Sequence, residues 1–209
     1  MRHVIFISLI ALCVSGTNAQ SIGPSTKFGV QANLGFVSLP GPEINGSHPL
    51  EEVYTVGYGG GAHLDIDLIT IALRISADYT TFSPDNGKYQ EALASFNPAA
   101  SGITVDGGAV NIISANVDGK VPFLPLPIFS PYFTGGLGIA KISADNPQIN
   151  GQAVTTSPGF DSGTSASANL GIGVDFNLIL SLYIEAKYIV IFDEGESSRF
   201  IPVSLGATF

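Results

Sequence analysis

Acids and bases recur in this chain at even spacings within apolar segments, a pattern that would place their side chains on one face. Arg74 and Asp78 belong to one such segment, and Glu185 and Lys187 belong to another. Charges that leave water cost several kcal/mol each unless they pair. We therefore predict two ion pairs, Arg74 with Glu185 and Asp78 with Lys187. The full predicted network comprises Arg74, Asp78, Glu185, Lys187, Asp65, Asp118, Lys120 and Asp175.

This network would either stabilise the fold or gate a water path. With Asp67 included, six acids share the predicted face with three bases. Such an excess of acid would favour cations along any water path.

Catalysis and metal binding have little support in the sequence. His48 and His63 are the histidines beyond the N-terminal segment, and neither belongs to a His-x-Ser pair. Because a catalytic histidine needs a nucleophile and a carboxylate within reach, we predict no enzyme activity and no cofactor. The acidic stretch 193–196 could hold Ca²⁺ or bridge lipopolysaccharide through divalent cations. We interpret it as a solvated loop and predict no metal site.

The composition points to a membrane protein that has no membrane-spanning helix. Charged residues make up 12% of the chain, against about 25% in soluble domains, and the mean hydropathy is +0.36. Beyond the N-terminal segment, no apolar run reaches the ~20 residues of a spanning helix. A closed barrel is the remaining spanning structure, because lipid offers no partner to an open sheet edge. The net charge of −9 argues against a nucleic-acid partner.

Residues 1–19 predict a cleavable secretory signal. Arg2 precedes an apolar run from Val4 to Val14, and the small residues Thr17 and Ala19 are typical of a cleavage site. The run is shorter than the ~20 residues that a spanning helix requires. The single cysteine, Cys13, lies in this run, so the predicted barrel domain, residues 20–209, would contain no thiol.

Eight later segments alternate apolar and polar residues with a period of two, as strands do. Short connections alternate with longer ones rich in Gly, Pro, Asn and Ser, which is the pattern of outer-membrane barrels. We predict an all-β fold, an eight-stranded antiparallel up-and-down transmembrane β-barrel, with one or two helical turns within Lys88–Phe96. The predicted strands are Thr26–Val37, Val53–Asp67, Thr70–Phe82, Gly108–Val121, Ser130–Ile142, Thr164–Leu178, Leu180–Phe192 and Arg199–Phe209.

The two faces of these strands predict which side meets lipid. One face is apolar, and the other carries mainly Gly, Ser, Asn and Thr, which suits the narrow interior of an eight-stranded barrel. Glycines 57, 59, 60 and 61 lie within one strand and would let the wall curve. Aromatic residues of the apolar face fall near the strand ends, as girdles at the two membrane interfaces do. The predicted girdles are Phe28, Phe36, Tyr54, Tyr58, Tyr79, Phe123, Phe133, Phe176, Tyr188 and Phe209.

Three segments resemble the small OmpA/OmpX-type outer-membrane barrel family. They are the Gly-rich stretch Pro131–Ala140, the stretch Ile184–Tyr188 and the final stretch Pro202–Phe209. The resemblance implies an anchoring, envelope-stabilising or surface-contact role, with membrane lipid and lipopolysaccharide around a monomer. It also implies that the strand ending at Phe209 is recognised by the barrel-assembly machinery. Two alternatives remain open: a small cation-leaning pore, and a soluble lipocalin-like ligand-binding barrel.

Overall fold

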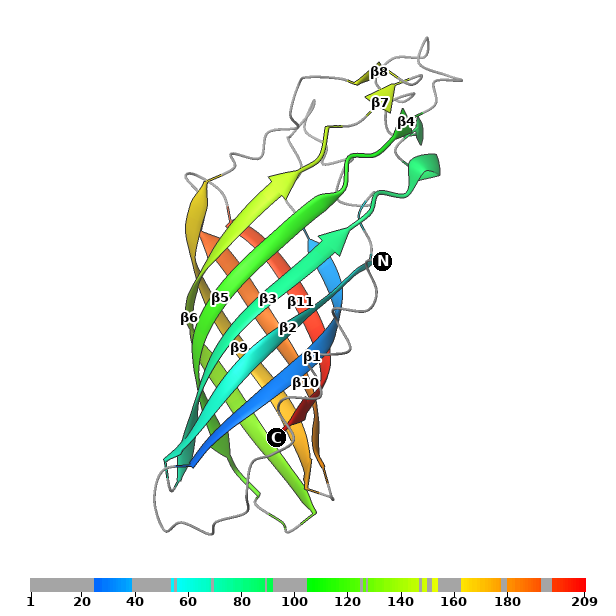
Figure 1. The fold of residues 1–209 in the computed structure, drawn as a ribbon. Helices are drawn as coiled ribbons and strands as arrows, with labels where there is room; N and C mark the ends of the chain where they lie inside the picture. Colours follow the sequence, from blue (N-terminus) through cyan, green and yellow to red (C-terminus); the bar gives the residue numbers. More distant parts are fainter. Residues whose placement is uncertain are drawn as a thin grey trace, which may run out of the picture.

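The computed structural model (Figure 1) is a closed barrel of eight antiparallel strands. It describes residues 25–38, 54, 56–68, 70–88, 90–91, 105–124, 126, 128–146, 148–149, 152–153, 163–177, 180–192 and 197–209. The barrel strands are β1 (Ser25–Ser38), β2 (Val56–Leu68), β3 (Ile71–Phe82), β5 (Val110–Pro122), β6 (Phe129–Ala144), β9 (Thr164–Asn177), β10 (Ser181–Phe192) and β11 (Ser197–Thr208). The predicted fold class is confirmed. The predicted signal at residues 1–19 lies outside the described residues.

The order around the ring is β1-β11-β10-β9-β6-β5-β3-β2, so each strand pairs with its neighbour along the chain and β1 pairs with β11. Phe28 and Phe209 complete the closure, since the N–H of each donates to the carbonyl oxygen of the other, at 3.2 and 2.7 Å. In this ring β3 and β10 stand opposite each other. The topology therefore brings Arg74 on β3 and Glu185 on β10 to face each other across the interior.

The connections differ at the two ends of the barrel. At one end, called the turn end here, the strands are joined through residues 69–70, 123–128 and 178–180. At the other, the loop end, three of the four connections are longer, and three short strands form a second sheet in the order β4-β7-β8. They are β4 (Val105–Asp106), β7 (Gln148–Ile149) and β8 (Gln152–Ala153), and they lie beyond the loop end in Figure 1.

The helical turns predicted within Lys88–Phe96 are present only in part. Helix covers residues 86–88 and 90–91, so it begins two residues earlier than predicted, and residues 92–96 lie outside the described residues. The carboxylate of Asp85 accepts the N–H groups of Gly87 and Lys88 at 2.9 and 3.2 Å, as a residue that caps a helix start does. Among the described residues, no helix is long and apolar enough to cross a membrane.

Apolar side chains cover the outer wall of the barrel, and polar side chains point inward. Leu34, Ile113, Leu137, Leu170 and Leu205 are each more than half exposed on the outer wall. Serine, asparagine, threonine and charged side chains are buried in the interior, called the lumen here. A wall of exposed aliphatic residues is stable where its solvent is hydrocarbon.

The aromatic girdles follow the prediction with one exception. Phe28, Phe36, Tyr58, Tyr79, Phe123, Phe133, Tyr188 and Phe209 are exposed on the outer wall. Phe176 is half-buried, and its ring lies 6.0 Å from that of Phe129. Tyr54 was wrongly assigned: its side chain is 5% exposed, and its hydroxyl donates to the carbonyl oxygen of Gly108 at 2.6 Å. Tyr54 precedes β2, so the alternation within that strand does not determine its direction.

Candidate functional site in the barrel lumen

Arg74 is the centre of a charged cluster in the turn-side half of the lumen. Its Nε and Nη2 donate to Oδ1 and Oδ2 of Asp65 at 2.7 and 2.9 Å. Asp65 lies directly across from Arg74 in the register of β2 and β3. Arg74 Nη1 lies 3.4 Å from Oε2 of Glu185 on the opposite wall. The predicted contact between Arg74 and Glu185 is confirmed, although Asp65 is the nearer and bidentate partner.

Glu185 and Lys187 extend the cluster along β10. Lys187 Nζ lies 3.2 Å from Glu185 Oε1 and 2.6 Å from Asp118 Oδ2. The second oxygen of Asp118 accepts a hydrogen bond of 2.7 Å from the Asn169 side chain. Arg74, Glu185 and Asp118 are each at most 1% exposed. Burial of this depth is tolerable because every one of these charges has an opposite charge in contact.

The predicted pair between Asp78 and Lys187 is wrong. Asp78 instead accepts hydrogen bonds from the side-chain amides of Gln31 and Asn33, at 2.5 and 3.1 Å. Arg74 and Asp78 are four residues apart on β3, about 13 Å at 3.3 Å per residue, whereas Glu185 and Lys187 are separated by about 7 Å on β10. The two spacings do not match, and Lys187 forms its ion pairs with Asp118 and Glu185 rather than with Asp78. Asp118 lies across from Arg74 in the register of β3 and β5. It pairs with Lys187 in place of Asp78.

Two tyrosines that the sequence reasoning did not single out complete the cluster. The Tyr132 hydroxyl donates to Glu185 Oε2 at 2.9 Å. The Tyr183 ring lies under the guanidinium of Arg74, 4.6 Å from Cζ to the ring centroid, and its hydroxyl donates to the side-chain carbonyl of Gln31. Both side chains are fully buried. Tyr183 thus connects the charged cluster to Gln31, one of the two amides that hold Asp78.

Glycines on the neighbouring strands make room for these rings. Tyr132 lies across from Gly173, and Tyr183 lies across from Gly206. A Cβ atom at either glycine would overlap the facing tyrosine ring. A large residue beside a glycine in the register of adjacent strands is thus the signal that could have revealed these two tyrosines. In β2, the same reasoning applies to Gly57, whose missing side chain leaves space for the Phe82 ring.

The turn end of the lumen opens as a vestibule of about 900 Å³. Lys120 and Asp175 line it and pair at 2.8 Å, and Lys27 pairs with Asp67 at 2.7 Å near its rim. Lys120 Nζ also lies 4.0 Å from the centroid of the Tyr132 ring. All eight residues of the predicted network therefore lie in the lumen or its vestibule. The vestibule ends at the cluster around Arg74.

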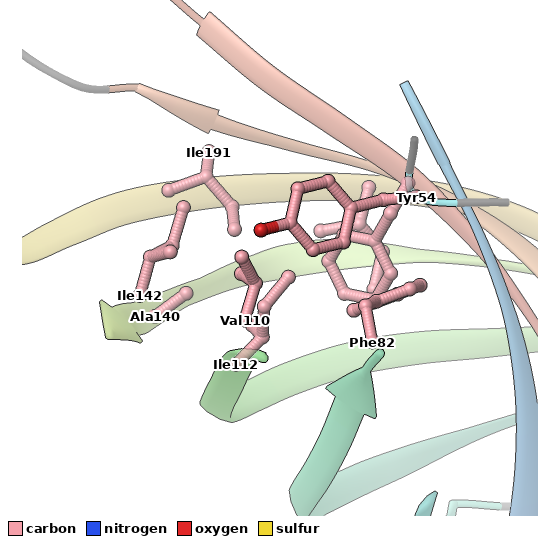
Figure 2. Packing of buried hydrophobic residues seen from close by; sticks show 9 residues of the cluster. Tyr54, Phe82, Val110, Ile112, Ala140, Ile142 and Ile191 are labelled. Atoms are coloured by element: carbon pink, nitrogen blue, oxygen red, sulfur yellow. The ribbon is translucent and has the colours of Figure 1, made fainter. Parts of the chain in front are cut away.

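The loop-side half of the lumen is filled by apolar side chains instead (Figure 2). Their side chains point toward one another from several strands, and each is at most 5% exposed. The rings of Phe82 and Phe200 meet edge to face with centroids 6.4 Å apart. We call this set the apolar plug; it consists of Tyr54, Phe82, Val110, Ile112, Ala140, Ile142, Ile189, Ile191 and Phe200.

The apolar plug was not predicted, because the lumen face was described by its Gly, Ser, Asn, Thr and charged residues and no aliphatic residue was assigned to it. The period of two, continued along each strand, places the plug residues inward. Ile189 and Ile191 follow Glu185 and Lys187 at even spacing, and Phe82 follows Asp78 in the same way. The alternation is thus a better guide to direction than hydropathy at this end of the barrel.

A small polar chamber lies between the charged cluster and the apolar plug. Its volume is about 20 Å³, which is enough for roughly one water molecule. Asn33, Asp78, Ser114 and Asn116 line it on one side, and Ile112, Ile189 and Phe200 on the other. The charged cluster therefore forms the wall of the chamber toward the turn end, and the apolar plug forms its wall toward the loop end.

Two other candidate groups from the sequence have different outcomes. His63 is buried near Tyr183, whose hydroxyl lies 3.2 Å from His63 Nδ1, while His63 Nε2 lies 3.3 Å from the Thr208 hydroxyl. These contacts make it a hydrogen-bonded residue of the lumen. His48 and the acidic stretch 193–196 lie outside the described residues. Among the residues that the structure does describe, no group of three or more His, Cys, Asp and Glu side chains is arranged to hold a metal ion.

Comparison with known proteins agrees with this architecture. The family model named "Outer membrane protein beta-barrel domain" matches residues 5–209. The chain therefore belongs to the outer membrane protein beta-barrel domain family. No curated protein sequence matches it.

Solved structures with the same fold are distant in sequence. Neisserial surface protein A is 16% identical with a TM-score of 0.57, over 89% of this chain and 97% of that one. The attachment invasion locus protein Ail of Yersinia pestis is 15% identical with a TM-score of 0.48, over 90% and 99%. The N-terminal β-barrel domain of Pseudomonas aeruginosa OprF is 13% identical with a TM-score of 0.43, over 88% and 97%. At these identities the likeness to Neisserial surface protein A concerns the fold alone.

Proposed function

We propose that this chain is a closed, non-conducting barrel that anchors in the outer membrane and presents its loops at the cell surface. The observation that carries the proposal is that two different closures follow each other along one lumen. The charged cluster around Arg74 occupies the turn-side half, and the apolar plug occupies the loop-side half. An ion would have to pass both.

The charged cluster opposes ion passage by occupying the space. Six of the eight strands contribute to it, through Asp65, Arg74, Asp118, Tyr132, Asn169, Glu185 and Lys187. A hydrated ion could enter only if these bonds were broken and the freed charges were solvated again. That cost is several kcal/mol per ion.

The apolar plug opposes passage by excluding water. Hydrophobic constrictions in channels close by dewetting, because their walls offer an ion nothing in place of its hydration shell. Ile112, Ile191, Val110 and Phe82 are at most 1% exposed, so they fill this level of the lumen. The polar chamber beneath them, with room for about one water, is isolated between the two closures.

The loop end is the side we expect to face the exterior. Outer-membrane barrels have short turns on the periplasmic side and long loops outside. Here β4 belongs to the connection between β3 and β5, while β7 and β8 belong to the connection between β6 and β9. Pairing of β4 with β7 joins two loops into one structure beyond the barrel. A closed barrel would thus serve as the support for this surface.

A cation-leaning pore is the second candidate, favoured by one observation. The vestibule of about 900 Å³ admits water from the turn end and is lined by Asp65, Asp67 and Asp175 as well as by lysines. In this alternative the closures would open part of the time. The lipocalin-like alternative has less support, because a soluble barrel needs a polar outer wall and this one is apolar.

Recording from planar bilayers tests the proposal. The refolded chain, with folding verified by heat-modifiable gel migration, should give no conductance steps. A variant that truncates both closures, Arg74→Ser with Glu185→Ser and Phe200→Ala, should conduct if it folds. Steady cation-selective steps from the unaltered chain would reject the closed barrel in favour of the pore.

Export and assembly complete the proposal. We expect the signal to be cleaved after Ala19, the final strand ending at Phe209 to engage the barrel-assembly machinery, and the barrel to act as a monomer. Membrane lipid and lipopolysaccharide would surround the apolar wall. Sequencing the N-terminus of the protein recovered from outer membranes would test the cleavage position.

A further inference from the structure

The connection between β5 and β6, residues 122–129, exposes an unusual number of large apolar side chains at the turn end. Leu124, Leu126 and Ile128 are 50, 47 and 61% exposed, and Phe123 and Phe129 are 49 and 39% exposed. The sequence of this connection contains no charged or polar side chain. An apolar surface of this kind marks a contact with another phase or molecule.

The exposed surface is continuous with the wall that faces lipid. The rings of Phe123 and Phe133 lie 4.7 Å apart, and those of Phe129 and Phe176 lie 6.0 Å apart. Phe133 and Phe176 belong to the girdle of the turn end. These two ring contacts join the connection to the girdle, so the material that covers the girdle can cover both.

The backbone of the connection suits a medium poor in water. Prolines at positions 122, 125 and 127 have no N–H group to satisfy. The N–H of Phe123 donates to the carbonyl oxygen of Pro131, and that of Leu126 donates to the carbonyl oxygen of Phe129, both at 3.1 Å. The carbonyl oxygen of Ile128 accepts the N–H of Asn177 at 2.9 Å. Backbone groups in a membrane must find such partners within the protein.

The opposite side of the same barrel end is charged. Lys27 on β1 and Asp67 on β2 form an exposed ion pair at the rim of the vestibule. In the ring, β1 and β2 lie across from β5, β6 and β9. The turn end thus carries its exposed ion pair on the side away from this connection.

We propose that residues 122–129 insert into the lipid leaflet at the turn end and bind phospholipid at the boundary between headgroups and acyl chains. The barrel would then be seated with its β5–β6 side deeper in the membrane than its β1–β2 side. Continuity with the girdle is the reason to assign lipid, rather than a protein, as the partner.

A single-tryptophan experiment tests this directly, because the chain contains no tryptophan. Leu126→Trp and, as an independent second probe, Ile128→Trp would be refolded into phosphatidylcholine vesicles. Thr70→Trp, in the turn between β2 and β3 at the vestibule, is the control for water. Leu137→Trp, at the most exposed position of the outer wall of β6, is the control for hydrocarbon. Depth would be read from quenching by lipids brominated at different positions along the acyl chain.

Tryptophan at 126 or 128 should emit at shorter wavelength than tryptophan at 70. It should be quenched most by bromine near the headgroup end of the chain, whereas tryptophan at 137 should be quenched most by deeper bromine. Emission and quenching equal to those of the Thr70→Trp control, in both probes, would overturn the proposal. That result is also the one expected if a periplasmic protein covers the connection, since pure vesicles contain none.

Discussion

The turn-side half of the lumen is filled by charged and hydroxyl side chains, whereas the loop-side half, built on the same strands, is filled by aliphatic and aromatic ones. The charged half depends on named partners: Arg74 needs both Asp65 and Glu185, and Lys187 needs Asp118. The apolar half depends on volume, because its members contact one another without specific geometry. Removal of one residue from the charged half should therefore leave charges without partners, whereas removal of a side chain from the apolar half should leave a cavity.

The largest effect is expected in the charged half. Arg74→Met leaves Asp65 and Glu185 facing each other without their shared cation, and it should lower the free energy of unfolding by about 4 kcal/mol. The measurement is urea unfolding in phospholipid vesicles, followed by circular dichroism. Lys27→Met, which breaks an exposed pair, is the matched control and should cost at most about 1 kcal/mol. Equal losses in the two variants would show that the cluster is not buried as described.

The apolar half should respond somewhat less, and additively. Ile191→Ala removes buried volume at a position that is 0% exposed, with an expected loss of about 3 kcal/mol. In combination with Arg74→Met the losses should add, because the two sites share no partner. A strong deviation from additivity in the same unfolding assay would mean that the two halves are one coupled unit.

The Tyr132 hydroxyl allows one hydrogen bond of the charged cluster to be tested by itself. Tyr132→Phe keeps the ring but removes the donor to Glu185, and hydrogen bonds to charged groups contribute about 1.5–3 kcal/mol. We expect a loss of about 2 kcal/mol. Tyr188→Phe, on the outer wall, is the control and should change the unfolding free energy very little. If the two variants behave alike, the Tyr132 hydroxyl does not support Glu185.

The smallest effect is expected at Asp78. Asp78 accepts from the amides of Gln31 and Asn33 and forms no ion pair. Because Asp78→Asn keeps one acceptor oxygen and removes a buried charge that has no ion-pair partner, it should cost about 1 kcal/mol or less. Asp118→Asn, which removes the partner of Lys187, should cost clearly more. If Asp78→Asn cost more than Asp118→Asn, the result would instead support the ion pair between Asp78 and Lys187 that was predicted from the sequence.

The contrast between the halves also explains what the sequence could predict. All eight barrel strands were recognised from their alternation, with ends within three residues of those observed. The pair of Arg74 with Glu185 followed from two facts: their strands are opposite in the ring, and both residues lie at a similar number of residues from the turn end. Partners within the lumen were harder: counting residues from the turns places Asp78 and Lys187 at similar heights, but Lys187 contacts Asp118 on the strand next to β3 instead.

Two further features were not predicted from the sequence. Tyr54 was assigned to lipid as a strand residue, but it precedes β2 and turns into the plug. The plug itself was hidden because hydropathy cannot tell an inward isoleucine from an outward one. Only the even spacing from Lys187 to Ile189 and Ile191, continued past the last charge, distinguishes the two.

The most direct test of the central claim, that the lumen is closed from both ends, is thiol labelling inside it. Cys13 is the only cysteine, so in a Cys13→Ser background Ser114→Cys places one thiol in the chamber between the closures, and Ser130→Cys places one in the vestibule. With the refolded barrel in detergent micelles, where both ends are accessible, a charged maleimide should modify the vestibule thiol and leave the chamber thiol unreacted until the protein unfolds. Rapid modification of Ser114→Cys in the folded barrel would contradict the closed lumen.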